Sequence, residues 1–221
     1  MKKYCIIGAG NYLSDIFDII HANNGKVVEI YHNAPESENT RGISIKQRID
    51  LLDYDVKYYR SLEKFVPSDE YRYIMGLARP SKYELIEKMK KKFKINFDIL
   101  VHPNAHIGSN VSTGEGTIIA PGTVIAPNVH IGDFVIINRN VSIGHDTKIG
   151  NFSNVGPAAN IAGSSKIDNN CIISMGALIL DHIMVGSWAI IGAGAVVTKD
   201  IEGGMVAVGV PAKPIKTNSQ D

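Results

Sequence analysis

Residues 125–148 read IAPNVH IGDFVI INRNVS IGHDTK, four consecutive units of six residues that each begin with isoleucine. The same unit runs without interruption from Val101 to Glu202, seventeen times in all. Its first position is Ile or Val in sixteen units and Thr113 in the remaining one. An uninterrupted hexapeptide period is typical of a parallel β-helix, so we predict a stack of triangular coils over this range.

Three units make one coil, so residues eighteen apart should lie directly above one another, about 4.8 Å apart. The first-position side chains are expected to stack inside the coil. The second position is mostly small, and we expect it to let the chain turn between two sides of the triangle. The small second-position residues include Gly108, Gly114, Ala120, Gly132, Gly144, Gly150, Gly156, Gly186 and Gly192.

Residues 1–100 lack the repeat and alternate short apolar strands with helical segments. Strands are expected at 3–7, 27–31, 56–59 and 71–75, and helices at 13–22, near Leu62 and from Ser81. The polar residues 32–41 read as a turn-rich segment. This alternation predicts a small Rossmann-like α/β domain with a parallel sheet. The expected organisation is therefore an α/β domain at 1–100, a β-helix at 101–202, and a C-terminal strand and tail at 203–221.

The composition excludes several classes of protein. A net charge of +1 gives no electrostatic reason to bind nucleic acid. No apolar stretch approaches the length of a membrane span, and the opening apolar run is too short for a signal peptide. Cys5 and Cys171 stand at apolar positions and should be buried rather than bonded to each other. We expect a soluble, cytoplasmic protein.

One position in the repeat points to chemistry. His145 occupies the third position of its unit, next to a corner and pointing outward. Gly163 follows eighteen residues later, so the imidazole should face a residue without a side chain, which leaves space for a thioester. Asp146 is adjacent and can orient the ring or raise its basicity. The three residues together predict a functional site at this corner rather than a surface His-Asp pair without a role.

Four motifs carry a family resemblance: the Gly8-Ala9-Gly10 turn, Ile-Gly-His-Asp at 143–146, IGAGAVVTKD at 191–200 and VGVPAK at 208–213. Through them the whole chain resembles the bacterial nucleotide-sugar N-acetyltransferases with a left-handed β-helix, such as the bacillosamine-pathway acetyltransferases and the GDP-perosamine N-acetyltransferases. The resemblance implies a left-handed coil, a homotrimer, and acetyl-CoA as cosubstrate in the cleft between neighbouring β-helices.

The resemblance also implies roles for particular residues. His145 would be the general base for the amino group of a nucleotide-linked amino sugar, expected to be a 4-amino-4,6-dideoxy sugar, and transfer would be direct. Asp146 would hold the imidazole, and the amide of Gly163 would bind the thioester oxygen. The residues expected to contact acetyl-CoA are Asn138, Asn154, Gly163, Met175 and Ala193. Asn154 stands where the family has a histidine.

The nucleotide-sugar is expected on the N-terminal domain. The residues that the resemblance places there are Gly10, Asn11, Tyr12, His32, Asn33 and Gly76, and Arg79 is added for its charge. His32 and Asn33 replace an acidic pair of the family. The Gly8-Ala9-Gly10 turn is a weak match to a dinucleotide fingerprint, because Leu13 stands at the third glycine position.

One alternative function is left open by the residues, and two others have less support. The same base could acetylate the hydroxyl of a sugar or of serine, and no residue decides between amine and hydroxyl. A zinc enzyme like the γ-carbonic anhydrases would need three converging histidines, but His145 and His182 lie two coils, about 10 Å, apart. No metal is therefore expected. A β-helix that only binds a partner does not explain why His145, Asp146 and Gly163 share one column.

Overall fold

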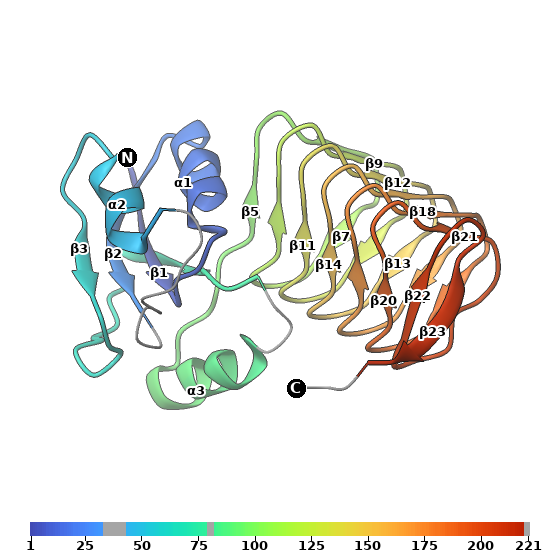
Figure 1. Cartoon of the computed structure of the whole chain (residues 1–221). Coiled ribbons are helices and arrows are strands. Elements are labelled where there is room, and N and C mark those ends of the chain that lie inside the picture. The colour runs from blue at the N-terminus through green and yellow to red at the C-terminus, as the bar shows by residue number, and fades with distance from the viewer. Residues whose placement is uncertain (33–42, 79–81, 219–221) are drawn as a thin grey trace. The chain divides into compact units, whose positions relative to one another are not determined.

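The computed structural model describes residues 1–32, 43–78 and 82–218. The chain divides into two compact units, Met1–Leu100 and Val101–Asp221 (Figure 1). The first unit is an α/β domain and the second is a left-handed β-helix. None of the helices in the described ranges is both long enough and apolar enough to cross a membrane.

The first unit contains a parallel sheet with the strand order β3-β2-β1-β4. Its strands are β1 (Lys2–Ile7), β2 (Gly25–Tyr31), β3 (Lys57–Tyr59) and β4 (Tyr71–Met75), and its helices are α1 (Leu13–Ala22), α2 (Ile45–Asp50) and α3 (Tyr83–Phe93). From β1 the chain continues to β2 on one side, and it later returns to β4 on the other. The carboxyl ends of β1 and β4 therefore form a topological switch point, where open α/β sheets bind ligands.

The predicted strands and the helix at 13–22 are confirmed, but two helix assignments need correction. The helix expected near Leu62 is wrong: the chain forms bends and a turn there, and Pro67 leaves no room for a helix to develop. Helix α2 was not predicted. It begins with a capping box, in which the Gln47 amide donates to Ser44 Oγ (3.1 Å) and the Ser44 amide donates to Gln47 Oε1 (2.8 Å).

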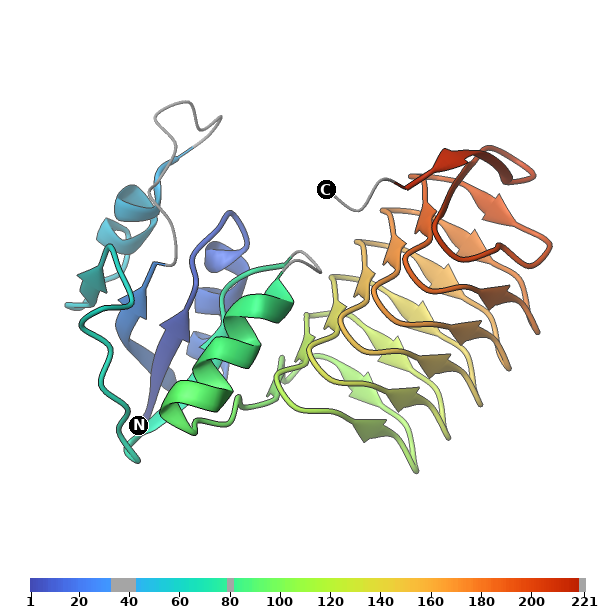
Figure 2. The same ribbon diagram turned by 90° about the horizontal axis from the view of Figure 1, so that it is seen from below.

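The second unit has three sheets, built mainly of parallel two-residue strands, one on each side of the coil (Figures 1 and 2). Sheet I comprises β7 (Ser112–Thr113), β10 (His130–Ile131), β13 (Lys148–Ile149), β16 (Lys166–Ile167) and β19 (Met184–Val185). Sheet II begins with β5 (Leu100–Val101), β8 (Ile118–Ile119), β11 (Ile136–Ile137), β14 (Asn154–Val155), β17 (Ile172–Ile173) and β20 (Ile190–Ile191). Sheet III comprises β6 (His106–Ile107), β9 (Val124–Ile125), β12 (Ser142–Ile143), β15 (Asn160–Ile161), β18 (Leu178–Ile179) and β21 (Val196–Val197).

The pairing confirms the spacing of eighteen: Ile143, for example, pairs with Ile125 on one side and Ile161 on the other. First-position side chains fill the interior, where Ile137, Val155 and Ile173 are fully buried. Inward-pointing hydroxyl groups at the fifth position bond to the next coil, as when Ser153 Oγ donates to the Asp168 carbonyl at 2.8 Å. Each of these buried hydroxyl groups thereby gains a partner.

The corners are built differently from the expectation. The third and fourth positions of each six-residue unit form the turn, and the fourth-position residue of every unit from Asn110 to Gly194 has a positive φ. The second position is small for another reason: a β-carbon on Gly144 would collide with the backbone of Ala162 and Gly163 in the next coil. The expectation that small second-position residues turn the corner is therefore wrong.

Sheet II ends with two further strands, β22 (Met205–Val208) and β23 (Lys213–Thr217). The first is parallel to β20 and was predicted, whereas β23 returns antiparallel to β22 and was not. Cys5 and Cys171 are both buried free thiols, as predicted.

Candidate active site

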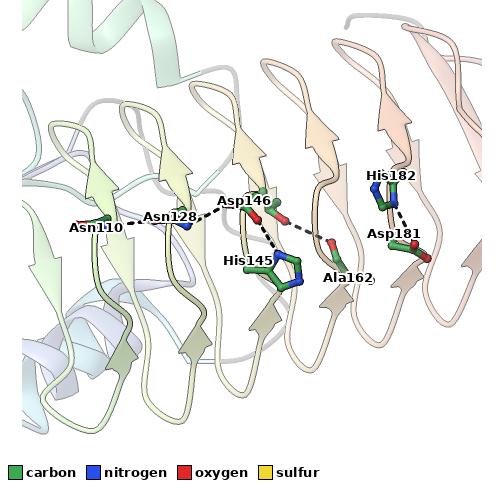
Figure 3. Close-up of polar contacts among 8 residues, drawn as sticks. Asn110, Asn128, His145, Asp146, Ala162, Asp181 and His182 are labelled. Atoms are coloured by element: carbon green, nitrogen blue, oxygen red, sulfur yellow. Dashed lines mark hydrogen bonds and ion pairs between the residues drawn. The ribbon is translucent and has the colours of Figure 1, made fainter.

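His145 lies on the corner between sheets III and I, which we call the His145 edge (Figure 3). This edge consists of third- and fourth-position residues from successive coils. They are Ser109 and Asn110, Pro127 and Asn128, His145 and Asp146, Gly163 and Ser164, and Asp181 and His182. Because Asp146 has the left-handed conformation, with φ of 60°, it turns the chain immediately after His145.

His145 and Asp146 form a hydrogen-bonded pair, with 2.7 Å between imidazole Nδ1 and carboxylate Oδ2. Hydrogen bonds from His145 and then from the Asn128 amide lower the pKa of Asp146 below its usual value. An ionised carboxylate favours the tautomer with hydrogen on Nδ1, which leaves a lone pair on Nε2. The side chains are 66% and 52% exposed in the single chain, so a substrate can reach Nε2.

Gly163 lies directly above the imidazole. A β-carbon on Gly163 would be 2.9 Å from His145 Nε2 and 3.0 Å from Cε1. Only glycine therefore leaves the space in front of Nε2 open. In the described part of the chain the Gly163 N–H has no hydrogen-bond acceptor, although its carbonyl accepts from the His182 amide at 3.2 Å. An unused amide at this point is available to a substrate oxygen.

The other residues expected to contact acetyl-CoA lie elsewhere on the same chain. Asn154 belongs to sheet II, and Asn138 directly follows strand β11 of that sheet; the Asn138 Oδ1 accepts from the Arg139 amide at 2.8 Å. Met175 and Ala193 lie on the corner between sheets II and III, which we call the Met175 edge; Met175 is 61% exposed. Sheet III separates this edge from His145. One chain alone thus brings together His145, Asp146 and Gly163, but not the full predicted set.

The residues expected to bind the nucleotide-sugar lie mostly at the carboxyl ends of β1, β2 and β4. Gly10 and the exposed Asn11 follow β1, and Tyr12 is the buried N-cap residue of α1. Gly76 follows β4 and packs so closely that a β-carbon would collide with the Gly8 carbonyl. These residues surround the switch point of the sheet.

His32 directly follows β2 and is 6% exposed, and its Nδ1 lies 3.1 Å from the Tyr58 hydroxyl. It is therefore packed into the domain. Asn33 and Arg79 lie outside the described residues, as do most of the segment 32–41 and Ser81, where the third helix was expected to begin.

Two features of the His145 edge were not predicted. Asn128 Nδ2 donates to Asp146 Oδ1 at 3.1 Å, and Asn110 Nδ2 donates to Asn128 Oδ1 at 3.2 Å. The signal was present in the sequence, since positions 110, 128 and 146 are eighteen apart and all Asn or Asp. The second feature is a pair between His182 Nδ1 and Asp181 Oδ2 at 3.0 Å. Within residues 1–32, 43–78 and 82–218, no three His, Cys, Asp or Glu side chains are grouped to hold a metal ion.

Comparison with known proteins agrees with this fold. Residues 164–199 match the family model described as "Bacterial transferase hexapeptide (six repeats)". Serine acetyltransferase of Buchnera aphidicola subsp. Schizaphis graminum is 32% identical over 210 residues, which cover 91% of this chain and 70% of that protein. A shorter match, 53% identical over 47 residues, covers 21% of this chain and 23% of a putative acetyltransferase of Schizosaccharomyces pombe.

Solved structures show the same two-domain fold. PerB from Caulobacter crescentus, in complex with CoA and GDP-perosamine, superposes with a TM-score of 0.83 at 22% identity and 98% coverage of both chains. The acetyltransferase domain of PglB from Neisseria gonorrhoeae gives 0.81 at 24% identity, with coverage of 97% and 100%. WeeI from Acinetobacter baumannii gives 0.78 at 23% identity, with coverage of 96% and 100%. The chain belongs to the hexapeptide-repeat acetyltransferases, a family of acetyl-CoA-dependent acyltransferases.

Proposed function

We propose that the protein transfers the acetyl group of acetyl-CoA to the amino group of a nucleotide-linked amino sugar, a 4-amino-4,6-dideoxy sugar being the expected class. One observation carries the proposal: the His145 Nδ1 is held by Asp146 while Nε2 faces the open space below Gly163. The structural likeness to PerB bound to CoA and GDP-perosamine, and to the PglB domain bound to acetyl coenzyme A, supports the choice of substrates.

The residues of the His145 edge suit a direct transfer. The sugar amine attacks the thioester carbonyl carbon while His145 Nε2 accepts a proton from the amine, and Asp146 stabilises the imidazolium that results. The Gly163 N–H donates to the oxygen that becomes negative. When the carbon–sulfur bond breaks, the CoA thiolate leaves and takes the proton from His145. The products are the N-acetyl sugar and CoA, and the histidine is neutral again.

The nucleotide part of the substrate fits the α/β domain. The carboxyl ends of β1 and β4 meet at the switch point, where α/β sheets bind nucleotides, and Gly8 and Gly76 allow the two chain segments to approach closely there. We place the nucleotide there, against Gly10, Asn11, Tyr12 and Gly76. His32 contributes through its packing on Tyr58, and Asn33 and Arg79 complete the proposed set.

A homotrimer would assemble the remaining parts of the site. The His145 and Met175 edges flank sheet III, and the outward residues of this sheet between 124 and 180 include no charged side chain. Val124, Leu178 and Leu180 on it are 48%, 40% and 44% exposed. If sheet III packs around a three-fold axis, the His145 edge of one subunit faces the Met175 edge of the next, which closes the ring. Asn138, Asn154, Met175 and Ala193 would then line the acetyl-CoA cleft from the neighbouring subunit.

A second candidate is transfer to a hydroxyl group, and the serine acetyltransferase of Buchnera aphidicola favours it. The same histidine would accept the hydroxyl proton. The α/β domain, with its switch point, favours a nucleotide-linked substrate over free serine.

The test is a panel assay for CoA release, with acetyl-CoA and UDP-, TDP- or GDP-linked 4-amino-4,6-dideoxy sugars. The corresponding 4-hydroxy sugars and free serine form the comparison arm. We expect turnover with at least one amino sugar and none with its hydroxyl counterpart. Turnover with serine or a hydroxyl sugar alone would replace this proposal with O-acetylation.

A further inference from the structure

Three residues form a continuous side-chain ladder along the His145 edge. Asn110, Asn128 and Asp146 occupy the fourth position of successive coils and have φ angles of 56°, 62° and 60°. Asn and Asp tolerate this left-handed conformation better than most residues. The identical backbone and the eighteen-residue spacing bring the three side chains within hydrogen-bond distance of one another (Figure 3).

The ladder uses both oxygens of Asp146. Oδ2 accepts from His145 Nδ1 at 2.7 Å, and Oδ1 accepts from Asn128 Nδ2 at 3.1 Å. The carboxylate is thus held from two sides. A carboxylate bound only by histidine could rotate about its side-chain bond and carry the imidazole with it, whereas two donors fix its plane.

Asp146 determines which way the Asn128 amide points. An ionised carboxylate only accepts hydrogen bonds, so Asn128 Nδ2 turns toward Asp146 and Asn128 Oδ1 turns away from it. On that far side Oδ1 accepts from Asn110 Nδ2 at 3.2 Å. The direction of the ladder is therefore set by Asp146, and Asn110 satisfies the amide oxygen that this orientation leaves over.

We propose that Asn128 is a positioning residue for acetyl transfer: through Asp146 it fixes the tautomer and orientation of the His145 imidazole, while its own oxygen accepts from Asn110. This inference rests on the function proposed above for the same site. Preference for a left-handed backbone explains why an asparagine is tolerated at position 128. Asn170 has the same left-handed backbone, with φ of 60°, but it lies on a corner without His145. A comparison of the two positions therefore separates the backbone preference from the proposed positioning role.

The first test compares Asn128→Gly with Asn170→Gly. Glycine keeps the left-handed backbone without strain, so both variants should fold. We expect Asn128→Gly to lower kcat between about threefold and tenfold, a part of the general-base contribution, with little change in the KM for acetyl-CoA. Asn170→Gly should keep wild-type kcat. Equal kcat values in the two variants would overturn the proposal.

A second readout needs no substrate. The nitrogen chemical shifts of the His145 imidazole report its tautomer in the free protein. The Nδ1–H tautomer should dominate in wild type and in Asn170→Gly, and its population should fall in Asn128→Gly. An unchanged population in Asn128→Gly would contradict the positioning role. If this population falls while the wild type acetylates no amino sugar, the proposed function fails and the positioning role stands.

The variant Asn128→Asp adds a pH signature. The groups around the new carboxyl are the Asp146 carboxylate above it, which disfavours its ionisation, and the Asn110 amide below it, which favours it; His145 lies beyond Asp146. When ionised it repels Asp146, and when protonated its O–H replaces the amide donor. The activity of Asn128→Asp relative to wild type should therefore rise as the pH falls. A ratio that does not change with pH would count against the proposal.

Discussion

Gly163 stands one coil above His145, so close that a β-carbon on the glycine would lie 2.9 Å from imidazole Nε2. The contact joins residues eighteen apart in sequence through the register of the β-helix. It also explains why the glycine is needed at this position: φ of Gly163 is not in the left-handed range, so the requirement is for space rather than for backbone freedom.

Gly163→Ala should therefore impair catalysis without unfolding the protein. The added methyl group meets the end of the His145 ring and occupies the space proposed for the thioester. We expect kcat/KM for acetyl-CoA to fall at least about a hundredfold, since a displacement of about 1 Å in a reacting geometry has that effect. The melting temperature should change by only a few degrees. Wild-type kcat/KM in this variant would show that the thioester binds elsewhere.

Asp146→Asn should separate the charge of this residue from its shape. The amide can still bond to His145, but it does not stabilise an imidazolium, so kcat should fall while the KM for acetyl-CoA stays close to wild type. The pKa of Asp146 is lowered in the folded protein, so its contribution to stability is present at neutral pH and is lost as the pH falls through that lowered value. Melting temperatures of wild type and Asp146→Asn should differ at pH 7, and the difference should shrink as the pH falls below 3.8, the ordinary value for an aspartate. A difference in melting temperature that stays constant from pH 7 to below pH 3.8 would contradict the lowered pKa of Asp146.

Sheet III is predicted to hold the subunits together. Leu178→Glu places a charge in the apolar surface of this sheet and should convert the trimer to monomers with loss of activity. Met184→Glu is the matched control, because Met184 is an exposed side chain of sheet I. Light scattering after gel filtration measures the mass. A trimeric Leu178→Glu protein would place the interface on another face.

The composite site makes a further prediction about mixed subunits. A His145→Ala chain retains an intact Met175 edge, and an Ala193→Trp chain, whose acetyl-CoA cleft is blocked, retains an intact His145 edge. Each variant alone should be inactive, and refolding the two together should restore part of the activity. No recovery from mixed trimers of confirmed composition would mean that the site lies within one subunit.

The buried side chain of Lys82 allows the packing of the α/β domain to be tested through the pH dependence of its stability. Its side chain is 2% exposed, and burial lowers the pKa of its amino group from 10.5 to about 7. Folding therefore releases a proton between those two pH values, and wild-type stability should fall as the pH drops from 10.5 to 7. Lys82→Met should be the more stable protein, by up to the order of 5 kcal/mol at pH 7 and by less at pH 10. Urea unfolding at the two pH values measures the difference, and equal stability of the two proteins would contradict it.

The periodic part of the molecule could be predicted from the sequence because a repeat converts sequence spacing into distance. The first-position aliphatic residues marked the interior, and the spacing of eighteen placed Gly163 over His145. In the α/β domain, α1 was predicted with its observed bounds because its apolar residues follow a helical period and Asn23-Asn24-Gly25 ends it.

Other features depend on contacts that spacing alone does not reveal. Helix α2 was missed because it has only six residues, although Ser44 and Gln47 carry a capping box. The role of the second position was misjudged because the collision with the next coil is visible only in three dimensions. The separation of Met175 from His145 follows from which sheet each one joins. Asn128 was missed because the spacing of eighteen places it under Asp146 but does not show that the two side chains form a hydrogen bond.

The role of His145 as the base for acetyl transfer is tested most directly by measuring kcat for CoA release by His145→Ala. The assay uses acetyl-CoA and the nucleotide-linked amino sugar that wild type turns over best, with His130→Ala as control. We expect a fall of about a hundredfold to ten-thousandfold for His145→Ala, with the trimer and melting temperature retained and His130→Ala fully active. Wild-type kcat in a correctly assembled His145→Ala trimer would contradict this role.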